Sequence, residues 1–252
     1  MRISAAKKLR GLIVAAIVLV TLAMPGNCNG QEIPPATDVI EEYVEALGGE
    51  MSINSLTSFK LTGTYMGKEF IVHYHEGTMC WFAFGGTYAY WVDAQRRFWQ
   101  RQEGEISLRD DLSPGYPSGF INLPTEAVRW LNDDQLKVTN LGAEYLDGVA
   151  TWRLLFEVEG QDSAERLFDQ ESGLLLQTRW MGSKTGIKSY EYTRLDDQLF
   201  ATTTNLDGVI LTFQKLEIDP DHGDLDFSIP KELEQQWQKN QQTESNNSPD
   251  RN

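Results

Sequence analysis

The residues best suited to chemistry are the histidines, and two of the three in the chain stand two positions apart. His73 and His75, with Glu76 beside them, fall in a segment of strand character, so both imidazoles point to the same face. Such a pair can supply two ligands to a metal ion, but a third is needed and His222 is the only other histidine. A metal-dependent enzyme built on His73 and His75 is therefore an alternative, and a solvent-facing strand edge is the expectation.

Acidic and hydroxyl side chains form no catalytic set that the sequence reveals. Asp219, Asp221, Asp224 and Asp226 surround a glycine, but their spacing lacks the distal glutamate of a calcium-binding loop. Ser118 has neither the spacing of a nucleophile elbow nor a nearby histidine. We therefore expect no catalytic residues, no resident metal and no cofactor.

Composition narrows the classes of partner. Of the 252 residues, 40% are hydrophobic, which is enough to form a folded core. The net charge of −15 repels phosphate backbones, so we expect no nucleic-acid partner. Two cysteines exclude a disulfide framework and a multi-cysteine zinc site.

The N-terminal segment has the order of a secretory signal. Four cations precede an apolar run of 14 residues, which ends before a proline–glycine pair. That run is shorter than the roughly 20 residues that span a membrane. We therefore expect residues 1–30 to be a signal peptide that is cleaved near Gly30, leaving a mature periplasmic chain without a transmembrane span.

The sequence after the signal segment predicts two helices. The first covers 38–47, with Asp38 and Glu41 as a reciprocal cap and Gly48-Gly49 at its end. The second covers 124–131 and begins at Pro124.

Strand patterning dominates the rest of the chain. Short segments of period two are separated by glycine-containing turns, which predicts a continuous antiparallel meander and an α+β, mainly β fold. The predicted strands cover 59–65, 69–76, 79–85, 87–93, 97–102, 136–146, 149–159, 164–169, 174–181, 187–194, 199–204 and 208–218.

The front hairpins are unusually apolar. Eleven aromatic residues lie between Tyr65 and Trp99, and segments 79–84 and 88–92 are apolar on both sides of the strand. Both faces therefore need cover. Either packed elements fill the space with their own side chains, or a curved sheet and two helices enclose a cavity for a lipid-like ligand. An acyl chain gains about 0.8 kcal/mol per buried methylene, so such a cavity needs no catalytic residue.

Six segments form an ordered pattern along the chain. They are Glu45-Ala46-Leu47-Gly48-Gly49, Phe59-Lys60-Leu61-Thr62-Gly63-Thr64, Leu141-Gly142-Ala143-Glu144-Tyr145-Leu146-Asp147-Gly148, Phe168-Asp169-Gln170-Glu171-Ser172-Gly173-Leu174-Leu175, Asn205-Leu206-Asp207-Gly208-Val209 and Phe227-Ser228-Ile229-Pro230. Together they resemble the LolA-like family of periplasmic outer-membrane lipoprotein-sorting, or lipoprotein carrier, proteins. The resemblance runs from about Asp38 to Pro230, and the order of the segments is stronger evidence than any one of them.

The resemblance implies an unclosed antiparallel half-barrel whose concave face is covered by helices. Founding members of the family carry acylated lipoproteins through the periplasm, although the gating arginine of the family matches no motif here. On this basis residues 31–230 are expected to form a LolA-like lipid-binding half-barrel domain. Residues 231–252, rich in glutamine and asparagine, are expected to be a disordered polar tail.

We expect the protein to be a non-enzymatic carrier or sensor that binds an acyl chain or another hydrophobic group. A lipoprotein on its way to the outer membrane is one cargo that the resemblance implies. The alternative is a structural or protein-interaction module of the cell envelope with a self-filled cavity and an envelope protein as partner. The ligand-binding wall is predicted to comprise Phe59, Leu61, Phe70, Val72, Tyr74, Trp81, Phe84, Tyr90, Trp91, Val128, Leu131, Trp152, Leu154 and Phe156.

Overall fold

Antiparallel strands build the protein, as the period-two sequence predicts. The computed structural model describes residues 32–83, 86–93, 97–108, 122–158, 163–181, 187–196, 198–235 and 237–239, and those from Ile33 onward belong to one unit. The first run of strands is β1 (Ser58–Tyr65), β2 (Lys68–His75), β3 (Thr78–Ala83), β4 (Tyr88–Val92), β5 (Phe98–Gln102) and β6 (Glu105–Leu108). The second is β7 (Leu136–Leu146), β8 (Val149–Val158), β9 (Ala164–Asp169), β10 (Leu175–Trp180), β11 (Ile187–Leu195), β12 (Gln198–Leu206) and β13 (Val209–Ile218).

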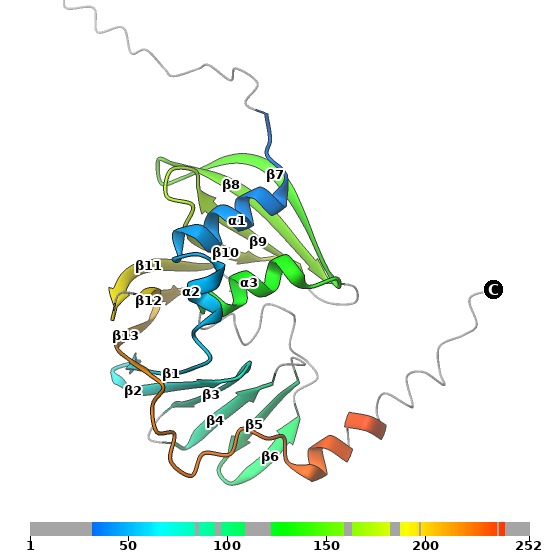
Figure 1. Ribbon diagram of the computed structural model, residues 1–252, viewed down its shortest axis with the longest axis vertical. Helices are drawn as coiled ribbons and strands as arrows, with labels where there is room; N and C mark the ends of the chain where they lie inside the picture. Colours follow the sequence, from blue (N-terminus) through cyan, green and yellow to red (C-terminus); the bar gives the residue numbers. More distant parts are fainter. Residues whose placement is uncertain are drawn as a thin grey trace, which may run out of the picture. The chain divides into compact units, whose positions relative to one another are not determined.

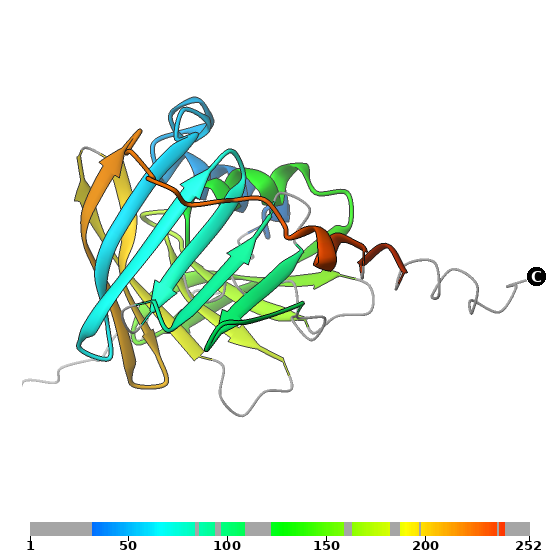
Figure 2. The same ribbon diagram turned by 90° about the horizontal axis from the view of Figure 1, so that it is seen from below.

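All these strands join one curved sheet in the order β6-β5-β4-β3-β2-β1-β13-β12-β11-β10-β9-β8-β7 (Figures 1 and 2). Each run is a meander, and the last strand returns beside the first, where Phe59 pairs with Ile218. Within the described residues β6 and β7 do not pair with each other, so the sheet stays open. The predicted unclosed antiparallel half-barrel is confirmed.

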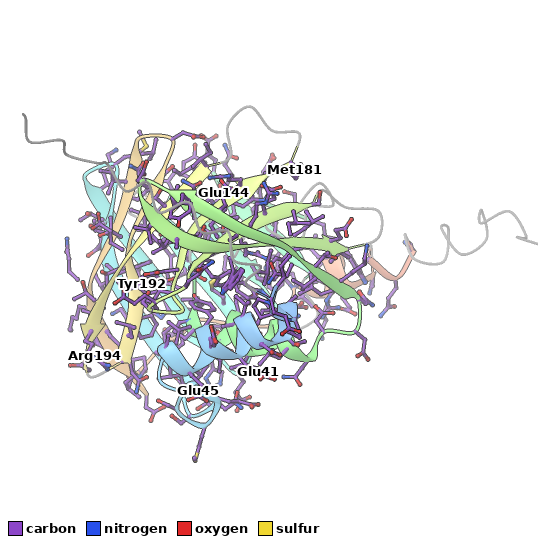
Figure 3. All side chains as sticks on the ribbon, turned by 90° about the horizontal axis from the view of Figure 1, so that it is seen from above. Glu41, Glu45, Glu144, Met181, Tyr192 and Arg194 are labelled. Carbon is purple, nitrogen blue, oxygen red and sulfur yellow. The ribbon has the colours of Figure 1, made fainter. Side chains whose placement is uncertain are left out.

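Three helices lie on the concave side of the sheet (Figure 1): α1 (Ala36–Ala46), α2 (Glu50–Asn54) and α3 (Pro124–Asn132). Apolar residues of α1 face the sheet, whereas Glu41 and Glu45 lie on its exposed side (Figure 3). The predicted cap at Asp38 is wrong: the helix begins at Ala36, so Asp38 lies inside the first turn, and Pro35 takes the cap position without a side-chain bond. The predicted end of the helix is confirmed, because Gly48 follows with a φ of 120°.

Two glycines permit close approaches that any side chain would block. At Gly63 the pairing of β1 with β13 shifts register, and a Cβ there would lie 1.8 Å from the carbonyl oxygen of Thr212. Gly173, in the turn from β9 to β10, has a φ of 71°, and its Cβ would lie 3.0 Å from the carbonyl oxygen of Glu42 in α1. These glycines let the two runs of strands join and let α1 lie against the sheet.

The core forms three clusters. The first joins α1 and α3 to β8–β12, and the second fills the inner face of β1–β5 and β13. The third lies on the outer face of β3–β5, where residues 219–235, here called the C-terminal strap, pack against it through Leu225, Phe227, Ile229 and Leu233. The strap crosses the outer side of these strands (Figure 2). Both faces of the aromatic hairpins are thus covered.

The described chain continues past the boundary expected at residue 230. Residues 231–235 and 237–239 are helical, and Leu233 is 6% exposed. Arg97 contacts both Asp93 and Glu234, which ties this helical segment to the loop between β4 and β5. The helices in the described part of the chain include none that is long and apolar enough to cross a membrane. The expected signal peptide lies outside the described residues.

Candidate functional site

The concave face is the part of the molecule where the predicted wall residues gather. The first cluster contains Val128, Trp152, Leu154 and Phe156, with Leu131 packed against it. The second cluster contains the larger set: Phe59, Leu61, Phe70, Val72 and Trp81, with Tyr74 and Tyr90 packed against it. The two clusters line one continuous side of the sheet, because paired strands keep side chains of the same register on the same face.

Trp91 does not belong to this wall and is a correction to the predicted set. Neighbouring residues of a strand point to opposite faces, so Tyr90 and Trp91 cannot share one. Tyr90 faces inward, whereas Trp91 lies in the third cluster and stacks on Trp99 at 6.0 Å between ring centroids. Phe84 lies outside the described residues.

A pocket of about 410 Å³ opens between α2, α3 and the end of β2. Its volume lies within the range of small-ligand sites. Tyr74 forms part of its wall and stacks on the fully buried Phe59, with 4.7 Å between ring centroids, so the pocket adjoins the inner-face cluster. The lining comprises Ile53, Asn54, Leu56, Thr57, Tyr74, Glu76, Gly77, Thr125, Glu126, Val128, Arg129 and Asn132.

The pocket has a mixed lining of apolar, polar and charged side chains. Glu126 and Arg129, one turn apart on α3, approach each other to 3.9 Å. Burial raises the pKa of Tyr74, so its phenol stays neutral at physiological pH. This arrangement suits an amphiphile, whose apolar part contacts the apolar lining while its polar end meets Glu126 and Arg129.

A buried hydrogen-bond network fixes α1 and the start of α3 to the sheet. Asn122 Nδ2 donates to the hydroxyl of Tyr43 at 2.7 Å and to that of Tyr192 at 3.0 Å. The hydroxyl of Tyr192 in turn donates to the carbonyl oxygen of Leu175 at 3.0 Å. Burial raises the pKa of both phenols, which therefore remain neutral donors. The alternation of Tyr190 and Tyr192 along β11 indicates an inward face, but sequence reasoning missed the network because Asn122 lies outside any periodic segment.

Two buried cations also lie on the concave face, and neither was predicted. The guanidinium of Arg166 lies 4.3 Å from the ring centroid of Trp130 and 4.0 Å from that of Phe156. Lys188 Nζ lies 4.3 Å from the ring of Trp180. Burial lowers the pKa of Lys188 to about 7, and the charge of Arg166 acts in the same direction. The contacts of Arg166 place positive charge against aromatic faces, where it is attracted by the ring quadrupole, and Lys188 gains the same attraction only in its protonated form.

The histidines lie on the opposite, outer face of the sheet. The expected solvent-facing strand edge is wrong, because β2 lies between β1 and β3 and the strap partly covers both His73 and His75. The strap brings His222 to 2.9 Å from His73, measured between their Nδ1 atoms. Among the described residues, no group of three or more histidine, cysteine, aspartate or glutamate side chains is arranged to hold a metal ion.

Comparison with known proteins identifies the fold. No protein-family model and no curated protein matches the sequence. A DUF1329 family protein from Desulfovibrio piger is similar in structure, with a TM-score of 0.50 and 13% identity over 77% of this chain and 97% of that chain. A LolA superfamily protein from Nitrosomonas europaea has a TM-score of 0.50 and 11% identity over 78% of this chain and 98% of that chain.

At these identities the likeness concerns the fold alone. Nearly the whole of each similar chain and more than three quarters of this chain are covered by the match. The resemblance to LolA-like proteins that the sequence indicates is thereby confirmed at the level of the fold.

Proposed function

We propose that the chain is an exported, non-enzymatic carrier or sensor that binds an acyl chain or another hydrophobic group against the concave face of its sheet. The observation that carries this proposal is the pocket of about 410 Å³ between α2, α3 and β2. It is bordered by Tyr74 and Val128, two residues of the predicted wall. Each methylene buried there contributes about 0.8 kcal/mol, so affinity follows from apolar contact.

The ligand class follows from the mixed lining. Leu56, Val128 and the ring of Tyr74 offer apolar surface, while Glu126 and Arg129 offer charge. A lipid or the acyl chain of a lipoprotein has this division into an apolar chain and a polar end. Export through a signal peptide at residues 1–30, a domain at 31–230 and transport or sensing in the periplasm belong to the same proposal.

Blocking the pocket mouth tests the proposal without disturbing the core. Thr57 lines the pocket but is exposed, so Thr57→Trp adds bulk at the mouth without replacing a buried side chain. Met51→Trp is the matched control, because Met51 is 87% exposed and lies on the adjoining helix outside the lining. We expect Thr57→Trp to weaken binding of a fluorescent fatty acid at least tenfold and Met51→Trp to leave it unchanged.

A second measurement uses the purified wild-type protein. Native mass spectrometry after gentle extraction is expected to reveal a bound lipid that Thr57→Trp lacks. If the wild type carries no lipid and takes up no fatty acid, the carrier proposal is wrong.

A structural or protein-interaction module of the cell envelope is the second candidate. Phe59, Leu61, Val72 and Leu154 have no exposed surface, so the protein itself already fills much of the space along the predicted wall. Under this alternative both tryptophan variants behave like the wild type in the lipid assays, and an envelope protein is the partner.

A further inference from the structure

All three histidines of the chain meet on the outer face of the sheet, although His222 is about 150 positions from the other two. His222 Nδ1 lies 2.9 Å from His73 Nδ1, and His222 Nε2 lies 2.9 Å from the hydroxyl oxygen of Ser58. The rings of His75 and His222 have centroids 5.8 Å apart. The strap therefore contacts β1 and β2 through imidazole side chains.

This contact begins the path of the strap across the aromatic outer face. Phe227 packs against His222 and His75, with ring centroids 5.1 and 5.5 Å away. At the preceding residue, the indole of Trp91 donates to the carbonyl oxygen of Asp226 at 3.3 Å. Loss of the histidine contact would free the first part of the strap and uncover Trp91.

The hydrogen bonds of His73 and His222 remain satisfied when the neutral pair takes up one further proton, but not when it takes up two. Ser58 can donate to His222 Nε2 while His222 Nδ1–H donates to His73 Nδ1, so a neutral pair is satisfied. A positive His222 still donates to both partners. When His73 is protonated as well, two N–H groups and two positive charges face each other at 2.9 Å, and no acceptor lies between them.

Charged groups of both signs surround the pair. Lys60 of β1 acts to lower the pKa of both His73 and His222, and His75 of β2 acts to lower that of His222. Glu217 of β13 acts to raise the pKa of His73, and Asp221 of the strap acts to raise that of His222. Glu217 is itself shared between Lys60 at 3.6 Å and Lys215 at 3.2 Å. On β3, directly opposite His73, stands the thiol of Cys80, whose pKa is raised by burial and which therefore stays neutral.

We propose that the contact of His222 with His73 and His75 is a pH-sensitive latch, which holds the strap on the sheet near neutral pH and releases it in acid. The latch lies on the outer face of the sheet, whereas Tyr74, which lines the pocket, packs in the inner-face cluster.

The direction follows from proton linkage. Burial lowers the pKa of His73 to about 4, with the charges of His222 and Lys60 acting in the same direction, and burial also lowers the pKa of His222. A released histidine has a pKa near 6.5. The attached strap is therefore fully favoured above pH 6.5, and the ratio of released to attached strap rises as the pH falls from 6.5 towards 4. The rise is up to about tenfold per pH unit for each proton taken up on release.

Hydrogen exchange of the full-length chain tests the latch. The exchange is measured by mass spectrometry on peptides that cover residues 219–230. After correction for intrinsic exchange, we expect the opening ratio of the strap to rise at least tenfold between pH 7.5 and 5.0. Peptides from β8 serve as the internal control and are expected to change little. In His222→Gln the side chain can still contact Ser58 and His73 but carries no second positive charge, so the rise is expected to shrink to the part that burial of His73 contributes. A wild-type strap with pH-independent protection, or a rise in His222→Gln as large as in the wild type, overturns the proposal.

A second measurement decides the matter if His222→Gln loosens the strap at every pH. The carbon-bound ring protons of His73 report its titration by NMR in the folded wild type. We expect His73 to titrate at least one pH unit below 6.5. Titration of His73 at 6.5 or above in the folded wild type overturns the latch.

Discussion

The join between the two runs of strands depends on the absence of a side chain at Gly63. A Cβ at this position would lie 1.8 Å from the carbonyl oxygen of Thr212, 2.8 Å from its carbonyl carbon and 2.9 Å from the Cα of Phe213. The first distance is about half the roughly 3.5 Å at which non-bonded atoms pack. All three contacts are with backbone, so no side-chain rotation relieves them. Gly63→Ala must therefore displace β13 from β1.

The expected cost is near the upper end of the range for overpacking, about 3 kcal/mol. For a chain of this size that corresponds to a fall in Tm of about 6–12 °C. Urea denaturation followed by circular dichroism measures the free energy of unfolding. Gly208→Ala is the control: Gly208 has a φ of 89° but a Cβ there meets nothing within 4 Å, so only the backbone strain of about 1 kcal/mol is expected. A Gly63→Ala protein within 1 kcal/mol of the wild type would refute the reasoning.

Two further predictions concern the buried polar groups of the concave face. Asn122→Ala removes the amide that donates to Tyr43 and Tyr192, and urea denaturation is expected to show a free energy of unfolding lower by about 2 kcal/mol. When Tyr192 is already replaced by phenylalanine, the same substitution is expected to cost about 1 kcal/mol less. Equal losses with and without Tyr192→Phe would contradict the network. Burial lowers the pKa of Lys188 from 10.5 to about 7, so above pH 7 the unfolded chain binds a proton that the folded chain releases. Stability of the wild type is therefore expected to rise by up to about 2 kcal/mol between pH 7.0 and 8.5, and Lys188→Met is expected to lose this rise; identical pH slopes in the two proteins would show that Lys188 is charged when folded.

The alternation of side chains along strands and the glycines at turns predicted most of the fold. The predicted segments overlap twelve of the described strands, because alternation and hairpin turns are local properties of the chain. The strand Glu105–Leu108 was missed, since it is short and three of its four residues are exposed, which leaves no apolar alternation to detect. The cap at Asp38 was misplaced because Pro35 allows the helix to begin two residues earlier.

The candidate site was less accessible to sequence reasoning, since it depends on contacts between distant segments. Trp91 follows Tyr90 in the same strand, so the two side chains point to opposite faces, but both were assigned to the predicted wall. The contact of His222 with His73 depends on the path of the strap, and nothing in the local pattern of residues 219–230 fixes that path. Arg166 is buried only because Trp130 and Phe156 approach it from α3 and β8. Local patterns predict which face a residue takes but do not reveal what crosses that face.

The distribution of polar contacts indicates where a ligand would enter under the proposed function. Tyr43 links α1 to the sheet through Asn122 and Tyr192, and the turn at Gly173 touches the backbone of the same helix. Lifting α1 would leave these buried groups unsatisfied, at about 1–3 kcal/mol each. Entry between α2 and α3 breaks none of these bonds, because none of the residues that line the pocket belongs to this network. The pocket mouth is therefore the lower-energy route, and for that reason Thr57, rather than a residue of α1, is the position at which blocking bulk should stop uptake.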